Sequence, residues 1–254
     1  MVTALVLLER RRPLRRAVEP GWRHDLRNLA VAAASGLVLQ IAERPVVEPL
    51  SRLVGRRRWG LLPRLGLPRW LEAALAVAAM DYTLYLWHVL THRLPFLWRF
   101  HAVHHADRDL SATTALRFHF AEMLLSVPWR AAQVAIIGVG PGALAAWRAC
   151  LFASILFHHA NLRLPRRFER RLAWLVMTPR LHGIHHSVAR AETDSNWSSG
   201  LTLWDRLHGT FRDDVPQRRI TIGVPGCGEP RQVTLPRLLV MPWRQASGRS
   251  FPEP

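Results

Sequence analysis

The chain has 254 residues, enough for one substantial domain or for a membrane core with a soluble cap, and 49% of them are hydrophobic. Its formal net charge is +17 at pH 7, and the basic residues are all arginine because the sequence contains no lysine. Apolar blocks alternate with arginine-rich ones, which favours positive flanks of membrane segments over nucleic-acid binding, for which no motif is present. Cys150 and Cys227 are the only cysteines, which excludes a disulfide framework and a CxxC site.

Residues 1–27 are interpreted as a basic N-terminal segment. A short apolar run over 2–8 is followed by E-R-R-R-P-L-R-R. The run is too short to span a bilayer, and its charges follow the apolar part, whereas those of a secretory signal precede it. We expect this segment to be either the end of a membrane anchor or an amphipathic segment that leads into the domain.

Two long apolar segments come next. The first, 28–42, is a short candidate span that is expected to stop at E-R-P. The arginine-, glycine- and proline-rich stretch 51–69 is then expected to be a loop on a polar surface. Residues 70–92 are predicted to form a long helix that Pro95 ends, so that the following segment starts afresh.

The last apolar block predicts a helical hairpin, because G-V-G-P-G-A at its centre indicates a turn between arms near 121–138 and 143–159. Because such a hairpin crosses the membrane twice, it returns the chain to the side of the membrane from which it started. The sequence therefore predicts an all-α membrane protein, a bundle of about four transmembrane or re-entrant helices with a cytosolic-side helical cap. We place this domain at 28–211, and we expect the Pro/Arg-rich tail 212–254 to lie as loops over the membrane-side face.

Eight histidines fall into three boxes, HxxxH and HxxHH before the hairpin and HxxHH after it: His88, His92, His101, His104, His105, His182, His185 and His186. Residues three and four apart share a helix face, so each box can aim its imidazoles at one point. Neutral imidazole ligates iron, zinc, copper or nickel, and eight are more than one mononuclear centre can use. The boxes predict a two-metal site on one side of the membrane.

The order of these boxes resembles that of the fatty acid hydroxylase and sterol desaturase superfamily, the membrane-bound histidine-box oxygenases. Several flanking phrases resemble its bacterial branch over 81–211: D-Y-T-L-Y-L-W-H-V-L-T-H, H-H-A-D-R-D-L-S-A-T-T-A-L-R-F-H-F-A-E, T-P-R-L-H-G-I-H-H-S and N-W-S-S-G-L-T-L-W-D-R-L-H-G-T. The chain departs from the pattern in its nearly absent leading anchor and in His208, where an aromatic residue is usual.

The resemblance implies a non-haem diiron centre that uses O2 to attack a C–H bond of a lipid. The eight histidines of the boxes would be its ligands. A further ligand would lie in the last turn of the hairpin, where His159 is the first candidate and His158 the second. The metal site is expected on the cytoplasmic side of an integral membrane protein, in a bacterial inner membrane.

Polar residues near the boxes are predicted to support the metal site, by holding the other ring nitrogen of a ligand histidine: Asp81, Asp107, Asp205, His119, Glu122 and Asn161. Surface or capping roles are the alternative for the first two, and a cap or salt bridge at a helix start for Glu122. Asp205 could instead pin the tail through an arginine. His24 and His208 are expected to be ordinary polar surface residues.

Aromatic residues near the boxes are expected to wall an apolar channel for the lipid or to pack in the core: Trp87, Trp98, Phe100, Phe118 and Phe157. Trp197 and Trp204 are expected at the bilayer interface.

The predicted function is O2-dependent hydroxylation or desaturation of a fatty acyl, sterol or related lipid at two irons. Because no GxGxxG fingerprint is present, a separate redox carrier, ferredoxin or cytochrome b5-like, and a reductase are expected to supply electrons. A zinc-dependent membrane hydrolase is one alternative, although no box contains the glutamate of HExxH. A non-enzymatic membrane metal-binding or transport protein is the other, although transport favours histidines spread through the spans.

Overall fold

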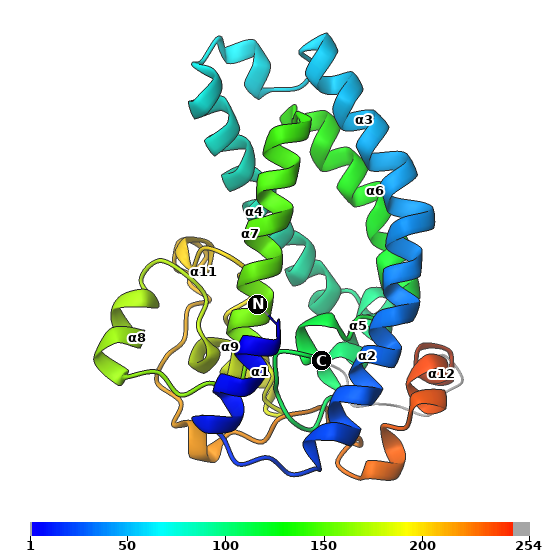
Figure 1. The fold of residues 1–254 in the computed structure, drawn as a ribbon, viewed down its shortest axis with the longest axis vertical. Coiled ribbons are helices and arrows are strands. Elements are labelled where there is room, and N and C mark those ends of the chain that lie inside the picture. Colours follow the sequence, from blue (N-terminus) through cyan, green and yellow to red (C-terminus); the bar gives the residue numbers. More distant parts are fainter. Residues whose placement is uncertain (1, 246–254) are drawn as a thin grey trace.

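The computed structural model describes residues 2–245. These residues form helices joined by loops, and no β-strand occurs among them, only isolated bridges. Long helices form the upper half of the molecule, and shorter ones surround their lower ends (Figure 1). The prediction of an all-α membrane protein is confirmed, since four segments are long and apolar enough to cross a bilayer: Gly21–Leu65, Arg69–Arg93, Phe120–Ile137 and Pro141–His159.

The first of these segments is longer than the sequence predicts. Helix α2 (Gly21–Val38) continues through a π-helical turn (Leu39–Glu43) into α3 (Arg44–Arg57). The expected stop at E-R-P is therefore wrong, and so is the first part, 51–57, of the loop expected at 51–69. The Arg44 N–H bonds to the Leu39 carbonyl, one residue farther back than in an α-helix. Pro45 then falls in the first turn of α3, where its missing N–H costs little.

Helix α4 (Arg69–Arg93) matches the predicted long helix, and Pro95 opens α5 (Pro95–His105) as expected. Leu94 joins the two helices in an extended conformation. The C-terminal end of α4 and the whole of α5 therefore meet at a sharp bend. The first two histidine boxes lie on the two sides of this bend.

The predicted hairpin is confirmed as α6 (Phe120–Ile137) and α7 (Pro141–His159), which meet at a turn near the top of Figure 1 and diverge below it. Gly138 ends α6 with φ of +91°, and a Cβ atom there would lie 2.4 Å from Pro63 Cδ and 2.6 Å from the Trp59 carbonyl oxygen. Only glycine fits this turn, because both its backbone angle and its close neighbours exclude a side chain.

Apolar side chains shared by α3, α4, α6 and α7 form the core of the upper half, among them Val54, Met80, Val134, Leu144 and Trp147. The outer faces of the long helices expose large apolar side chains instead, such as Leu26, Leu37, Ile41 and Ile136. An apolar surface of this kind is suited to lipid rather than to water.

The lower half contains helices from both ends of the chain, α1 (Val2–Arg11) and α12 (Leu235–Gln245) among them. The remaining helices are α8 (Arg166–Leu172), α9 (Pro179–His185), α10 (Arg190–Thr193), α11 (Leu203–Leu207) and the short 3-10 turns Leu62–Leu65, Thr114–Leu116, Gln217–Arg219 and Pro230–Gln232.

The tail is not composed of loops alone, which corrects the prediction for 212–254. Helix α12 packs against α5, where Leu238 and Met241 are buried together with Trp98. These two residues are three apart and share a helix face. The prolines of α12 obscure this helical spacing in the sequence, although Pro236 lies in the first turn and Pro242 near the end of the helix. The tail beyond 245 lies outside the described residues.

Candidate metal centre

Four helices deliver histidines to one region at the junction of the two halves. The last turns of α4 carry box one, α5 carries box two, α7 ends in the pair His158 and His159, and α9 carries box three. The hairpin thus returns the chain to the side that it left, as predicted. All ten of these imidazoles are buried.

The nine histidines predicted as ligands fall into two groups, in each of which the candidate ligand atoms lie within 4.8 Å of one another. Group one contains His88, His92, His101, His105 and His185. Group two contains His104, His159, His182 and His186. The structure therefore brings all nine together in an arrangement with room for two ions.

Boxes two and three are each divided between the groups, so the expectation that each box aims at one point holds for box one alone. His104 and His105 are neighbours in sequence but belong to different groups, and so do His185 and His186. Consecutive residues point about 100° apart around a helix and do not share a face. The HxxHH spacing consequently suits two adjacent ions better than one.

The ring nitrogens fit a pair of transition-metal ions. Nε2 of His88 lies 3.1 Å from Nε2 of His185, and Nε2 of His159 lies 2.9 Å from Nε2 of His182. Both ring nitrogens of His92 and of His105 are buried without a hydrogen-bond partner among the described residues. Buried polar atoms without partners cost free energy, and a cation among these imidazoles would satisfy many of them at once.

The protonation state also suits metal binding. Burial, reinforced by the neighbouring imidazoles, lowers the pKa of His104, His105, His182 and His186 well below the ordinary value. Burial likewise lowers the pKa of His185 to about 3. These histidines are therefore neutral at pH 7, the form in which imidazole binds a metal.

Hydrogen bonds fix the outer ring nitrogen of several ligand candidates. Nδ1 of His88, His159 and His185 donates to the carbonyl oxygens of Trp197, Ile155 and Ser195, over 2.6 to 2.9 Å. An imidazole that carries its proton on Nδ1 presents the lone pair of Nε2 to its group.

Glu122 holds the outer ring nitrogen of His101, the role that the sequence predicts for a supporting carboxylate. Its Oε1 atom lies 2.8 Å from Nδ1 of His101, which can donate to it. Both side chains are buried, and Oε2 of Glu122 has no hydrogen-bond partner among the described residues. Among the six predicted supporting residues, Glu122 is the one whose side chain bonds to a ligand candidate within the described chain.

Asp81 and Asp205 hold a loop rather than a histidine. Asp205 accepts the backbone N–H groups of Trp197 and Ser198, at 2.9 and 3.0 Å, and is not bonded to an arginine within the described chain. Asp81 accepts the N–H of Leu201 and the indole N–H of Trp204. Their contribution to the site is indirect, because the carbonyl that fixes His88 belongs to the same loop.

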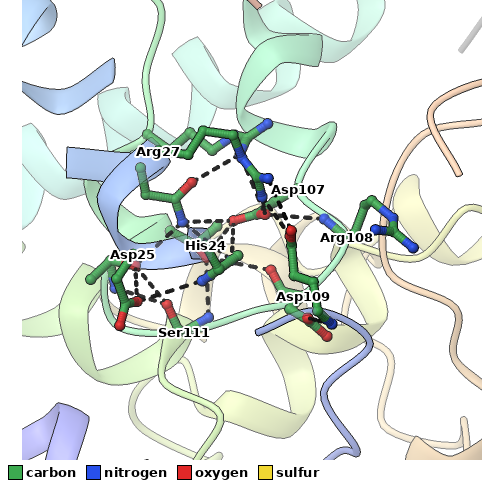
Figure 2. A network of polar contacts seen from close by, with 12 residues as sticks. His24, Asp25, Arg27, Asp107, Arg108, Asp109 and Ser111 are labelled. Carbon is green, nitrogen blue, oxygen red and sulfur yellow. Dashed lines mark hydrogen bonds and ion pairs between the residues drawn. The ribbon is translucent and has the colours of Figure 1, made fainter. Parts of the chain in front are cut away.

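Asp107, which follows box two, binds the N-terminal part of the chain instead of a ligand histidine (Figure 2). Its carboxylate lies 2.9 Å from Nε2 of His24, accepts the Asn28 amide and the Thr114 hydroxyl, and pairs with Arg117. Burial acts to raise the pKa of Asp107, but the charges of His24 and Arg117 and these hydrogen bonds hold it well below its ordinary value. The network attaches α2 to the end of α5.

His24 therefore corrects an expectation, because it is 3% exposed and bonded to Asp107 rather than lying on a polar surface. No sequence signal joins these residues, which are 83 positions apart. His208 is exposed, as expected, and its ring packs against Tyr82 and Tyr85, with Nε2 3.2 Å from the Tyr82 hydroxyl.

Two other predicted supporting residues also have structural roles. His119 caps α6, where its Nδ1 accepts the Ala121 N–H and its Nε2 donates to the Leu239 carbonyl. Asn161 bonds through its side chain to the backbone N–H and carbonyl of Arg15. Neither side chain is in either histidine group. His158, the second candidate for the hairpin ligand, packs against the His182 ring but is also outside both groups.

A largely apolar cavity of about 430 Å³ opens beside the histidines between α2, α4, α6 and α7. Trp87 and Phe118 line it as predicted, and Phe118 stacks on the His104 ring with centroids 4.5 Å apart. The other three aromatic residues, Trp98, Phe100 and Phe157, are not part of its lining, and Trp98 and Phe100 are buried in the core, which was the alternative expected for them. Trp197 is buried at 2% exposure, so the prediction that it sits at the bilayer interface is wrong.

Residues 73–210 match the profile of the fatty acid hydroxylase family, which is more than half of the chain. No solved structure matches the fold.

Among the similar characterised proteins is the ornithine lipid hydroxylase OlsE of Rhizobium tropici, 32% identical over 160 residues, which are 63% of this chain and 47% of that protein. The alkylglycerol monooxygenase of Xenopus tropicalis is 29% identical over 153 residues, which are 57% of this chain and 30% of the relative. The cholesterol 25-hydroxylase of Rattus norvegicus is 26% identical over 192 residues, 71% and 61% of the two chains. This chain thus covers less than two thirds of each of these relatives.

Proposed function

The chain belongs to the fatty acid hydroxylase family, and from this premise we propose that it is an O2-dependent oxidoreductase that hydroxylates or desaturates a C–H bond of a membrane lipid at a non-haem diiron centre. The observation that carries the proposal is the division of nine buried histidines into two adjoining groups beside an apolar cavity. The three relatives above are named for the oxidation of lipids with very different head groups and skeletons. Lipid oxidation in general is therefore better supported than any one lipid substrate.

Group one and group two would each hold one iron. Bound ferrous iron would supply the activation of O2 that attack on a C–H bond requires. The outer ring nitrogens of these ligands would be held by backbone carbonyl oxygens and by Glu122, which would fix the imidazoles around each iron.

The chain's own residues would orient the lipid and keep water out. The apolar walls of the cavity would hold an acyl chain or sterol skeleton against His104 and His159, both of which line it. Glu122 also lines the cavity, and its unpartnered Oε2 is available to accept or release a proton there while Oε1 holds the Nδ1 proton of His101. Phe118, stacked on His104, would exclude water from the same side.

We further propose that the histidine end of the bundle faces the cytoplasm, because a separate ferredoxin or cytochrome b5-like carrier and its reductase would have to reach it. Arginines on this half of the molecule would favour an acidic carrier. The same side chains could also contact lipid head groups.

Metal analysis of the purified protein tests the proposal together with oxygen labelling. About two irons per chain, and label from 18O2 gas in a lipid product, are the expected results for hydroxylation. Unlabelled product with a new double bond would indicate desaturation. Zinc alone would favour the hydrolase alternative, and loosely held mixed metals would favour transport. Comparison of total lipids from cells with and without the gene would identify the substrate.

A further inference from the structure

The apolar cavity has a second polar end, far from the histidines. Arg130 of α6 and Arg148 of α7 line this end, while His159 lines the other. Arg148 and His159 are eleven residues apart on one helix, and the helical rise separates their backbones by about 16 Å. The cavity is therefore elongated, with guanidinium groups at one end and imidazoles at the other.

The two arginines differ in their partners. Arg148 is neutralised locally, because its Nη2 atom lies 2.8 Å from Oε1 of Glu43 and its Nη1 atom 3.4 Å from Glu48. Arg130 donates from Nη1 to Gln133 and lies with its guanidinium carbon 4.3 Å from the centre of the Trp147 ring. It forms no ion pair with a carboxylate of the described chain.

Arg130 is 8% exposed, and its buried Nε has no hydrogen-bond partner among the described residues. Glu43 acts electrostatically on Arg130, but Glu43 and Glu48 are already paired with Arg148 and Arg44, so three guanidinium groups face two carboxylates. Burying a guanidinium in a membrane-embedded cavity costs free energy, and an anion bound beside it would offset that cost.

We propose that Arg130 binds the anionic group, a carboxylate, of a single-chain acyl substrate whose apolar tail runs along the cavity toward the histidines. A guanidinium offers two parallel N–H groups to a carboxylate, and the pairing is strong where water is excluded. The apolar walls between the two ends, including Leu39, Leu84 and Leu151, suit the tail. This inference rests on the proposed function, in which the cavity is the substrate site. It adds that the distance between Arg130 and the histidines determines which carbon of the acyl chain is oxidised.

Binding of tritiated hexadecanoic acid to the purified protein in detergent, with competition by unlabelled lipids, tests the inference without turnover. Hexadecanoic acid should compete better than its methyl ester by roughly tenfold to a hundredfold, the contribution of hydrogen bonds to a charged group. Hexadecyl phosphate as a third competitor distinguishes a carboxylate site from a phosphate site. If it competes best, the anion is a phosphate and the carboxylate assignment is overturned.

Arg130→Gln should remove the preference for the acid while leaving the affinity for the methyl ester unchanged. Arg52→Gln is the matched control, because Arg52 is an exposed arginine of α3 outside the cavity lining, and it should keep the preference. Equal competition by acid and ester in the wild-type protein would overturn the inference even if Arg130→Gln does not fold. A protein that prefers the acid but oxidises no lipid would contradict the proposed function alone, and lipid oxidation without the preference would contradict the inference alone.

Discussion

The rings of His105 and His186 are stacked with centroids 4.2 Å apart and planes within 12° of parallel, although the two residues belong to different histidine groups. This contact makes the two groups neighbours. Boxes two and three each contribute to both groups, so α5 and α9 together form the boundary between the two candidate metal positions. An ion lost from one group should therefore disturb the other.

The adjacent pair His158 and His159 gives a matched test of the ligand assignment. Both are buried at the end of α7, but only His159 lies in a histidine group. His159→Ala should lower iron content and abolish lipid oxidation, as should His104→Ala and His185→Ala. His158→Ala should retain iron, as measured by metal analysis of variants with equal helical content by circular dichroism. Full activity of His159→Ala, or iron loss only in His158→Ala, would contradict the assignment.

A second prediction concerns the contact between Glu122 and His101. Because Oε1 accepts the Nδ1 proton, Glu122→Ala should free the imidazole to turn and should weaken iron binding about tenfold to a hundredfold. Glu122→Gln keeps an acceptor but loses the charge, and should lie between the alanine variant and the wild type. Iron affinity measured by competition with a chelator checks the order of the three proteins. Equal affinities would mean that the carboxylate does not support His101.

The hairpin and the box positions could be predicted because both depend on local rules. Gly138 and Pro141 mark the turn by backbone geometry, and the spacing of box one puts His88 and His92 on one face of α4. The division of box two could also have been predicted, since adjacent residues such as His104 and His105 diverge around a helix.

Other features depend on contacts between distant segments and leave no pattern in the sequence. The continuation of α2 into α3 requires a π-helical turn before Pro45, which its residue types do not specify. The bond between His24 and Asp107 joins positions 83 residues apart. Asp81 and Asp205 look like supporting carboxylates by their positions near the boxes, but the fold directs both toward backbone and indole N–H groups of one loop.

His24 gives a third prediction, which concerns stability. Its removal leaves the buried carboxylate of Asp107 with one charged partner fewer, although Arg117 and Asn28 remain (Figure 2). His24→Ala should therefore lower the free energy of unfolding by about 1.5–3 kcal/mol. His208→Ala, outside this network, is the control and should change it much less. Thermal unfolding followed by tryptophan fluorescence compares them, and equal melting temperatures of the two variants would contradict a structural role for His24.

The attachment of α1 should depend on pH through Glu9. Its Oε2 atom accepts the N–H groups of Ala112 and Asn161 at 3.0 Å each. Burial, the largest influence, raises the pKa of Glu9 from 4.5 to about 6 despite these bonds. Because the folded protein holds the proton more tightly than the unfolded chain, this contribution to stability is complete below about 4.5 and is lost as the pH rises through about 6.

Helix α1 should consequently be more firmly attached near pH 5 than near pH 7.5, by about 1 kcal/mol. Hydrogen exchange of the α1 amides, corrected for intrinsic rates, measures this difference. Glu9→Gln keeps the shape of the side chain without its titration, so its α1 should show no such change. Asp25 and His24 also act electrostatically on Glu9, but both are present in the wild type and in the variant. The difference between the two proteins therefore isolates Glu9, and an identical pH dependence in both would assign the effect to other groups.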